Sequence, residues 1–492
     1  MKRYLSFLMA LALCLSLTGC GQRAAAADGD TFAVLTQTTN TAESEEEPTP
    51  DVTITLADGA TRTDGGGVTV DGDVITITAA GTYRLTGTLT DGQIVVAAQD
   101  AKVTLLLDGA SITNSGSAAV YVAEADKVTL FLAEGSENSL ASADEYAQSE
   151  DGIDAAVFAH DDVTIRGSGA LTITSETGHG VVTKDDLKIK NGTITVTAAK
   201  KGLSANDSVE LSGGVVTVTA GTDAIHVENL EEPEKGTVVI QGGAISLTAG
   251  NDGVDASGAV TITGGTLYIT SGTDMTQTDS GKGVKSAQSI TVSGGALAIN
   301  AQDDGVHSDG DVTVTGGQLA VASADDGVHA QSLLQIDGGE LAISAMEGLE
   351  GTYVKITGGT IRIKASDDGI NAGRKSSAYT PTVEITGGDI TIEMGAGDTD
   401  GIDSNGSVLV SGGTINITGS SSFDYDGTAQ FTGGTIIVNG QQIDYIPNQM
   451  MGGMGGRGGM MGGFGGFGGG QNGNQGGLPG GNQGGFGGRG RG

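Results

Sequence analysis

The sequence has no tryptophan, only two cysteines and six prolines among 492 residues, and aromatic side chains make up 4% of it. A hydrophobic core must therefore be built from Val, Ile, Leu and Ala, whose short alternating runs with Thr favour strands over helices. Positive charge is also scarce, because 24 Lys and Arg face 60 Asp and Glu, for a formal net charge of −36. Nucleic acid is therefore not an expected partner, since Lys and Arg bind phosphate backbones, whereas divalent cations are favoured.

Long apolar runs are absent except near the N-terminus, so no other segment is expected to span a bilayer. The first twenty residues, MKRYLSFLMALALCLSLTGC, have a basic start, an apolar run and a short ending, which is typical of a secretory signal. The ending LTGC resembles the lipobox of bacterial lipoproteins, and this resemblance implies lipidation of Cys20 after removal of the signal together with Cys14. We therefore expect an exported protein that acyl chains anchor to the outer face of the bacterial membrane. An ordinary cleaved signal is the alternative.

Composition divides the chain into segments. Residues 43–50, ESEEEPTP, close an acidic and Thr-rich stretch, and Gly-rich sequence such as MGGMGGRGG follows Pro447. The expected organisation is a lipoprotein signal peptide (1–20), a linker (21–50), a carbohydrate-binding repeat domain (51–446) with irregular N-terminal coils and cap (51–150), and a disordered Gly/Met-rich tail (447–492).

A repeated unit fills the region between linker and tail. It consists of a short strand, two glycines and a second short strand, as in VTITGGTLYITS (260–271) and VTVTGGQLAVAS (312–323), and most copies lie 20 to 22 residues apart. Short strands at this period, without helical periodicity, predict an all-β, single-stranded parallel β-helix with about 22 residues per coil. A β-sandwich is the structural alternative, but it would not produce so regular a period.

An acidic motif accompanies the repeat, as in QDDGVHS (302–308) and ADDGVHA (324–330). An acid precedes the glycine, and a second polar residue follows three positions after that acid. Because the intervening Val or Ile points inward, we expect stacking to place these residues in two columns on the outer face. The first column contains Asp151, Asp252, Asp304, Asp326, Glu347, Asp368 and Asp400. The second contains Asp154, Asp255, His307, His329, Glu350, Asn371 and Asp403.

Stacked acids favour a bound cation. Like charges about 5 Å apart repel by roughly 3 kcal/mol at an effective dielectric constant of about 20. Carboxylate oxygens suit Ca²⁺ better than zinc or copper. The alternative is that the aspartates bond to backbone groups at turns, as Asp does before Gly. The predicted Ca²⁺ ligands are Asp252, Asp255, Asp304, Asp326, Glu347, Asp368, Asp400 and Asp403.

Basic residues interrupt the columns. The segment GKGVKSA (281–287) places Lys282 in the first column and Lys285 in the second. Lys285 is either a counter-ion for the acids around it or, if the protein is a polysaccharide lyase, the base that removes a sugar proton. His226, His307 and His329 are expected to share one column, as ligands of a transition metal or as hydrogen-bonded groups. No other catalytic residue is predicted.

Three segments ahead of these coils carry a resemblance: AGTYRLTGTLTDGQIVVAA (80–98), KVTLLLDGASITNS (102–115) and ADKVTLFLAEGSENSL (125–140). Together with the DDG and TGG coils, they resemble a family of secreted bacterial carbohydrate-binding β-helix proteins, described in clostridia as binding cellulose and pectate-like polysaccharide. The resemblance covers roughly residues 51–440. It implies a right-handed β-helix that bears Ca²⁺ and is related in fold to calcium-dependent pectate lyases.

Three functions are consistent with these features. The first is a surface-anchored, non-catalytic, calcium-bearing protein that binds polysaccharide. The second is a calcium-dependent, pectate-type lyase that uses Lys285, and the third is a structural or adhesive surface protein. The lack of tryptophan disfavours crystalline cellulose, because flat sugar platforms usually use that side chain. An acidic polyuronate such as polygalacturonate, bridged by Ca²⁺, is favoured over a cellulose-like ligand, and a monomer is expected.

Overall fold

The computed structural model describes residues 45–142, 146, 152–274, 280–397 and 399–448. These residues form 45 strands and contain no helix, which confirms the all-β prediction. Within these ranges there is accordingly no helix of the length and hydrophobicity that a membrane crossing requires. The predicted signal peptide with Cys20, most of the linker, Asp151 and the tail from residue 449 onward lie outside the described residues.

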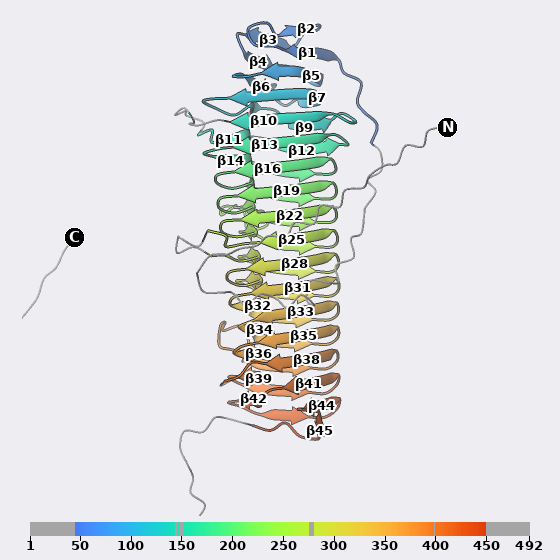
Figure 1. Ribbon diagram of the computed structural model, residues 1–492, viewed down its shortest axis with the longest axis vertical. Coiled ribbons are helices and arrows are strands. Elements are labelled where there is room, and N and C mark those ends of the chain that lie inside the picture. Colours follow the sequence, from blue (N-terminus) through green and yellow to red (C-terminus); the bar gives the residue numbers. More distant parts are fainter. Residues whose placement is uncertain (1–44, 143–145, 147–151, 275–279, 398, 449–492) are drawn as a thin grey trace, which may run out of the picture. The chain divides into compact units, whose positions relative to one another are not determined.

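The strands stack in chain order and pair mainly in parallel, as in a parallel β-helix (Figure 1). From β11 to β29 each strand pairs with the strand three places later, so three parallel series run along the stack. Lys285 pairs with His307 and His307 with His329, each 22 residues further along the chain. The step from Asp255 to Lys285 is longer, because a loop is inserted there.

The bounds of the strands follow the three series. The series that carries the acidic motif contains β11 (Ala155–Ala159), β14 (His179–Thr183), β17 (Leu203–Ala205), β20 (Ile225–Val227), β23 (Val254–Ala256), β26 (Val284–Ser286), β29 (Val306–Ser308), β32 (Asp326–Ile336), β34 (Glu347–Ile356), β36 (Asp368–Ala372), β39 (Asp400–Ser404) and β42 (Ser421–Tyr425). The second series contains β12 (Asp162–Gly167), β15 (Asp186–Ile189), β18 (Ser208–Leu211), β21 (Thr237–Ile240), β24 (Val260–Ile262), β27 (Ser289–Val292), β30 (Asp311–Val314), the distal parts of β32 and β34, β37 (Thr382–Ile385), β40 (Ser407–Val410) and β43 (Ala429–Phe431). The third contains β13 (Ala170–Ser175), β16 (Thr193–Ala198), β19 (Val215–Ala220), β22 (Ala244–Ala249), β25 (Thr266–Thr270), β28 (Ala296–Ala301), β31 (Gln318–Ser323), β33 (Glu340–Ala345), β35 (Thr360–Ala365), β38 (Asp389–Met394), β41 (Thr414–Thr418) and β44 (Thr435–Val438).

The N-terminal part of the stack is less regular. It contains β1 (Val52–Leu56), β2 (Arg62–Thr63), β3 (Val68–Asp71), β4 (Val74–Ile77), β5 (Gly81–Leu89), β6 (Gln93–Ala97), β7 (Lys102–Asn114), β8 (Val120–Glu124), β9 (Lys127–Leu132) and β10 (Glu137–Ser142). Antiparallel pairs occur here, between β1 and β2 and between β3 and β4, and again at the other end, between β44 and β45 (Gln441–Ile443).

Inward-facing aliphatic side chains form the core as continuous columns. In the motif-bearing series, one column places each apolar side chain on its counterpart in the next coil, and every member is at most 1% exposed. Its members are Val254, Val284, Val306, Val328, Leu349, Ile370, Ile402 and Phe423. Burial of this column determines which side chains of each strand point inward, because a shift of one residue would expose the whole set. The inward orientation predicted for the Val or Ile of the motif is confirmed.

Glycine pairs form one corner of most coils. Gly317 has a φ of +88°, a left-handed conformation that residues with a Cβ rarely adopt. A Cβ at this position would also lie 2.9 Å from the carbonyl oxygen of Gly294 in the preceding coil. The second glycine of the predicted strand–Gly–Gly–strand unit therefore permits both the turn and the close stacking of coils.

Candidate functional site

Two columns of polar side chains flank the inward Val and Ile column, one on either side of it. The second column, three residues after each motif acid, is in continuous register. It runs through His226, Asp255, Lys285, His307, His329, Glu350, Asn371, Asp403 and Asp424. The predicted common column of His226, His307 and His329 is therefore confirmed. We call the first- and second-column residues of one strand a rung.

The motif glycine allows the coils to approach closely at each rung. A Cβ at Gly305 would lie 2.2 Å from Cγ1 of Val321 and 2.7 Å from the carbonyl oxygen of Gly327. Neither contact is possible for a larger residue without displacement of the coil. The invariant spacing of acid, glycine and second polar residue thus follows from packing, and it fixes where both polar side chains start.

The first column is more buried than the sequence suggested. We expected these acids on an exposed outer face, but Asp252 is 1% exposed, Asp304 3% and Asp326 6%. The expectation of exposure is wrong for these three acids, whereas Glu347, Asp368 and Asp400 are half-buried. The carboxylate of Asp326 contacts His329, and those of Asp252 and Asp304 accept backbone hydrogen bonds from the next coil. The N–H of Lys282 donates to Oδ1 of Asp252 (2.7 Å), and the N–H of Asp326 donates to Oδ1 of Asp304 (3.0 Å). The predicted side-chain to backbone bonds therefore exist, although they join coils.

Lysines of both columns neutralise several acids. Nζ of Lys282 lies 2.5 Å from Asp303 and 3.1 Å from Asp304. Nζ of Lys285 lies 3.2 Å from Oδ1 of Asp255 and 3.6 Å from Oδ2 of Asp252.

These contacts decide what Lys285 can do chemically. Burial alone would lower the pKa of Lys285, but the charges of Asp255 and Asp252 outweigh burial and raise it. A protonated amine cannot remove a sugar proton. The geometry favours the counter-ion interpretation of Lys285.

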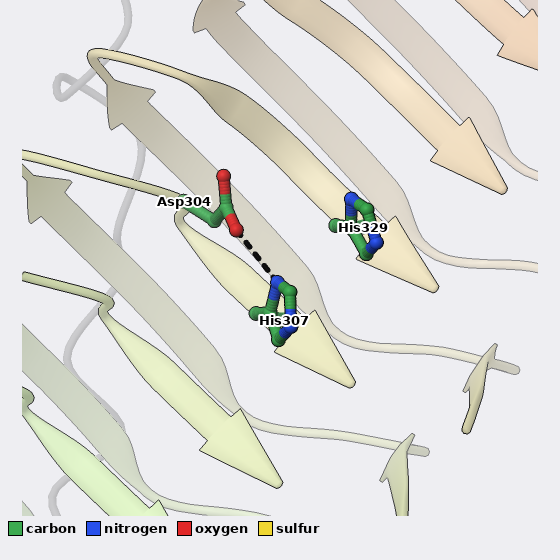
Figure 2. Close-up of side chains that lie close together, drawn as sticks. All are labelled: Asp304, His307 and His329. Carbon is green, nitrogen blue, oxygen red and sulfur yellow. Dashed lines mark hydrogen bonds and ion pairs between the residues drawn. The ribbon is translucent and has the colours of Figure 1, made fainter. Parts of the chain in front are cut away.

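The two neighbouring histidines are held by acids of both columns. Nδ1 of His307 lies 2.6 Å from Oδ2 of Asp304. A dashed line marks this contact in Figure 2. Nδ1 of His329 lies 2.8 Å from Oδ2 of Asp326 and 2.7 Å from Oε2 of Glu350. Burial alone would raise the pKa of Asp304, but the hydrogen bond with His307 and the charge of Lys282 lower it to about 2.

Toward the C-terminus the rungs lose these basic partners. Among the described residues, no Lys, Arg or His nitrogen forms an ion pair with Asp368, Asp403 or Asp424. Burial and the charges of Asp403 and Glu347 raise the pKa of Asp368 to about 8. Burial, together with Asp424 and Asp400, raises the pKa of Asp403 to about 6. We call Glu347, Asp368, Asn371, Asp400, Asp403 and Asp424 the acidic rungs.

Structure and prediction differ at particular positions. The prediction that Asp154 belongs to the second column is wrong, because Phe158 occupies the corresponding position through its pairing with Val182. Asp154 instead lies 3.2 Å from Nε2 of His179. Asp223 was missed because Ala replaces the glycine of its motif, although an acid three residues before His226 was a usable signal.

A loop residue was also missed. Lys375, in the segment that follows β36, places Nζ 2.6 Å from Oε1 of Glu350. It lies outside the repeat, so its spacing gave no signal.

Comparisons with known proteins identify the family of the chain. A family described as carbohydrate-binding domain-containing protein matches residues 71–327 and 321–445. A carbohydrate-binding domain-containing protein from Acetivibrio thermocellus is 41% identical over 137 residues, which are 27% of this chain and 48% of that protein. The chain thus matches about half the length of this relative.

A solved structure from C. thermocellum is also similar. It is described as a polysaccharide lyase-like protein in a gadolinium derivative, is 37% identical, and has a TM-score of 0.46 over 49% of this chain and 96% of the other. The family match covers nearly all of the described stack, from β4 to β45. The chain therefore belongs to the family of carbohydrate-binding domain-containing proteins.

Proposed function

We propose that this chain is a non-catalytic, calcium-bearing protein that binds an acidic polysaccharide along a right-handed parallel β-helix with about 22 residues per coil. The match to a carbohydrate-binding family along almost the whole stack carries this proposal. Absence of catalysis is proposed because Lys285, the candidate lyase base, is held by Asp252 and Asp255 as a charged group.

Calcium is proposed for the acidic rungs. Their donor set consists of oxygens alone, which Ca²⁺ prefers. Oδ1 of Asn371 is buried and has no hydrogen-bond partner, while its Nδ2 donates to Oε2 of Glu347 (2.8 Å). Asn371 pairs in register with Asp403, so this free oxygen belongs to the same group of carboxylates. Glu347, Asp368, Asp400 and Asp403 would hold the ion, which would neutralise their mutual repulsion.

The other four predicted calcium ligands are less suited to the ion. Asp252, Asp255 and Asp304 each contact a lysine, and Asp326 contacts His329. A dication at these positions would have to displace an existing positive charge or a proton. We therefore confine the calcium proposal to the acidic rungs.

The proposed ligand class follows from charge. A polyuronate is itself anionic, and a chain of net charge −36 would repel it unless a cation bridges the two. Calcium held by the acidic rungs would supply such a bridge to uronate carboxylates. Neutral cellulose gains nothing from this bridge, so polygalacturonate is the favoured ligand.

Calorimetric titration with polygalacturonate tests the proposal. Binding is expected in Ca²⁺ and lost in excess EDTA, and Asp403→Asn, which removes a proposed ligand, should weaken it by at least the roughly 10-fold that outer-shell changes cost. Asp389→Asn removes the same charge from an exposed position at the start of β38 and should leave affinity unchanged. Undiminished binding in EDTA would reject the calcium bridge, and no saturable binding to any glycan would favour the structural or adhesive alternative.

We also propose that the protein is exported, lipid-anchored through Cys20 and monomeric. The basic, apolar and LTGC segments of the first twenty residues support this anchor. Metabolic labelling with a radioactive fatty acid should mark the wild-type protein and not Cys20→Ser. Equal labelling of both proteins would contradict lipidation at this residue.

A further inference from the structure

Two imidazoles and three carboxylates converge on consecutive rungs in the middle of the stack. This imidazole cluster consists of Asp304, His307, Asp326, His329 and Glu350 on β29, β32, β34 and the turn before β29. Potential ligand atoms of Asp304, His307 and His329 lie within 4.8 Å of one another, and so do those of Asp326, His329 and Glu350. The two groups share His329, so they form one continuous cluster.

The cluster is built into the fold. His307 and His329 occupy paired positions, and their rings stack with centroids 4.5 Å apart and planes 16° apart (Figure 2). Asp326, His329 and Glu350 are all more than nine-tenths buried. Nε2 of His329 is buried and has no hydrogen-bond partner, whereas its Nδ1 contacts two carboxylates. Two carboxylates thus contact one ring nitrogen, and a single proton on that nitrogen can form a well-aligned hydrogen bond with only one of them.

The charges around the imidazoles leave room for a dication. Six acids contribute negative charge to the cluster and its immediate surroundings: Asp303, Asp304, Asp309, which lies 3.2 Å from Nε2 of His307, Asp325, Asp326 and Glu350. Lys282 contacts Asp303 and Asp304, and Lys375 contacts Glu350, so two positive charges oppose them. The excess is four negative charges with neutral imidazoles and two with both imidazoles protonated, so a divalent ion can replace the ring protons without making the cluster positive.

The donor set indicates the class of ion. Imidazole nitrogens together with carboxylate oxygens suit Zn²⁺ and its neighbours Co²⁺ and Ni²⁺, whereas Ca²⁺ prefers oxygens alone. We propose that His307 and His329, with carboxylates from Asp304 and from Asp326 or Glu350, bind one divalent transition-metal ion. A ring nitrogen must be free of its proton to bind the ion, so an imidazole that these acids keep protonated releases one proton when the ion binds.

The ligands need only small movements. Around a zinc ion, ligand atoms at about 2.0–2.2 Å from the metal lie roughly 3.3 Å from one another. The acid–imidazole contacts of 2.6 to 2.8 Å would open by about half an ångström, and the stacked rings would tilt toward a common point.

A second cluster in the same column provides a matched control. Asp223, His226 and Asp255 also bring three potential ligand atoms within 4.8 Å. This cluster has one imidazole instead of two, and Nζ of Lys285 already lies 3.2 Å from Asp255. We therefore expect the ion at His307 and His329 and not at His226.

The test uses the full chain, purified without a histidine tag and stripped of metal with a chelator. Calorimetry with ZnCl₂ and visible absorption with CoCl₂ should show one ion per chain, with proton release that depends on the buffer. His329→Gln and, independently, His307→Gln should each weaken binding at least about 100-fold, beyond the 10- to 100-fold typical of outer-shell changes. His226→Gln should bind as the wild type does, and excess Ca²⁺ should not displace the Co²⁺ spectrum.

Circular dichroism and thermal unfolding verify that the variants fold, and His307→Gln serves if the more buried His329 variant does not. Polygalacturonate binding in Ca²⁺ should be unchanged in both variants, which separates this site from the proposed calcium function. Absence of saturable Zn²⁺ or Co²⁺ binding by the wild type would overturn the proposal. So would binding that survives both substitutions, or that His226→Gln weakens to the same degree.

Discussion

The rungs on β26, β29 and β32, which we call the basic rungs because their second-column residues are Lys285, His307 and His329, share one register and one apolar column with the acidic rungs on β34, β36, β39 and β42. The charges around the acids of the two regions are opposite. Asp304 has basic neighbours that lower its pKa to about 2, whereas Asp368 lies among acids that, with burial, raise its pKa to about 8. Both aspartates accept the backbone N–H of the following rung. The motif therefore fixes the backbone contacts, and the second-column residues decide the charge state and the class of ion that fits.

The largest effect is expected from removing a lysine of the basic rungs. Lys282→Met should lower the free energy of unfolding by about 3 kcal/mol, because it leaves buried Asp304 and neighbouring Asp303 without their lysine. Urea unfolding, followed together with hydrogen exchange of the amides on β26 and β29, would measure this loss. Lys190→Met, at an exposed position, should change stability by less than about 0.5 kcal/mol. Equal losses of stability in the two variants would show that Lys282 stabilises the fold no more than an exposed lysine does.

The acidic rungs should respond to charge removal in the opposite direction. In excess chelator, Asp403→Asn should raise the free energy of unfolding by about 1 kcal/mol, because it relieves repulsion among Asp368, Asp400 and Asp424. In Ca²⁺ the sign should reverse, since the variant lacks a proposed ligand. Thermal unfolding in chelator and in Ca²⁺ would show this reversal of sign. A destabilised variant in chelator would mean that Asp403 makes favourable contacts of its own.

Much of this arrangement was readable from the sequence because packing enforces the register. The inward Val and Ile column, the glycine corners and the common column of the three histidines all follow from the same order of residues within each coil, although insertions lengthen some coils. Burial of the aspartates was not predictable, because it depends on side chains turning toward amides of the next coil. Phe158 took the place predicted for Asp154 because the chain before β11 departs from the regular spacing, so the motif there is out of register.

Asp185 lies outside both regions, and its smaller effect on stability distinguishes general charge repulsion from the binding of an ion. Burial, with Asp207 and Asp162, raises the pKa of Asp185 to about 6 from 3.8. The native state therefore holds this proton more tightly, so its stabilising contribution is complete below about pH 4 and is lost as the pH rises through about 6. Asp185→Asn should remove this component, roughly 1 kcal/mol after allowance for partial exposure, from the stability difference between about pH 4 and pH 8. Urea unfolding at the two pH values would measure it. Because we expect no ion here, Ca²⁺ should leave this difference between variant and wild type unchanged. If Ca²⁺ abolished it, the calcium response of the acidic rungs would reflect general screening of charge and not a bound ion.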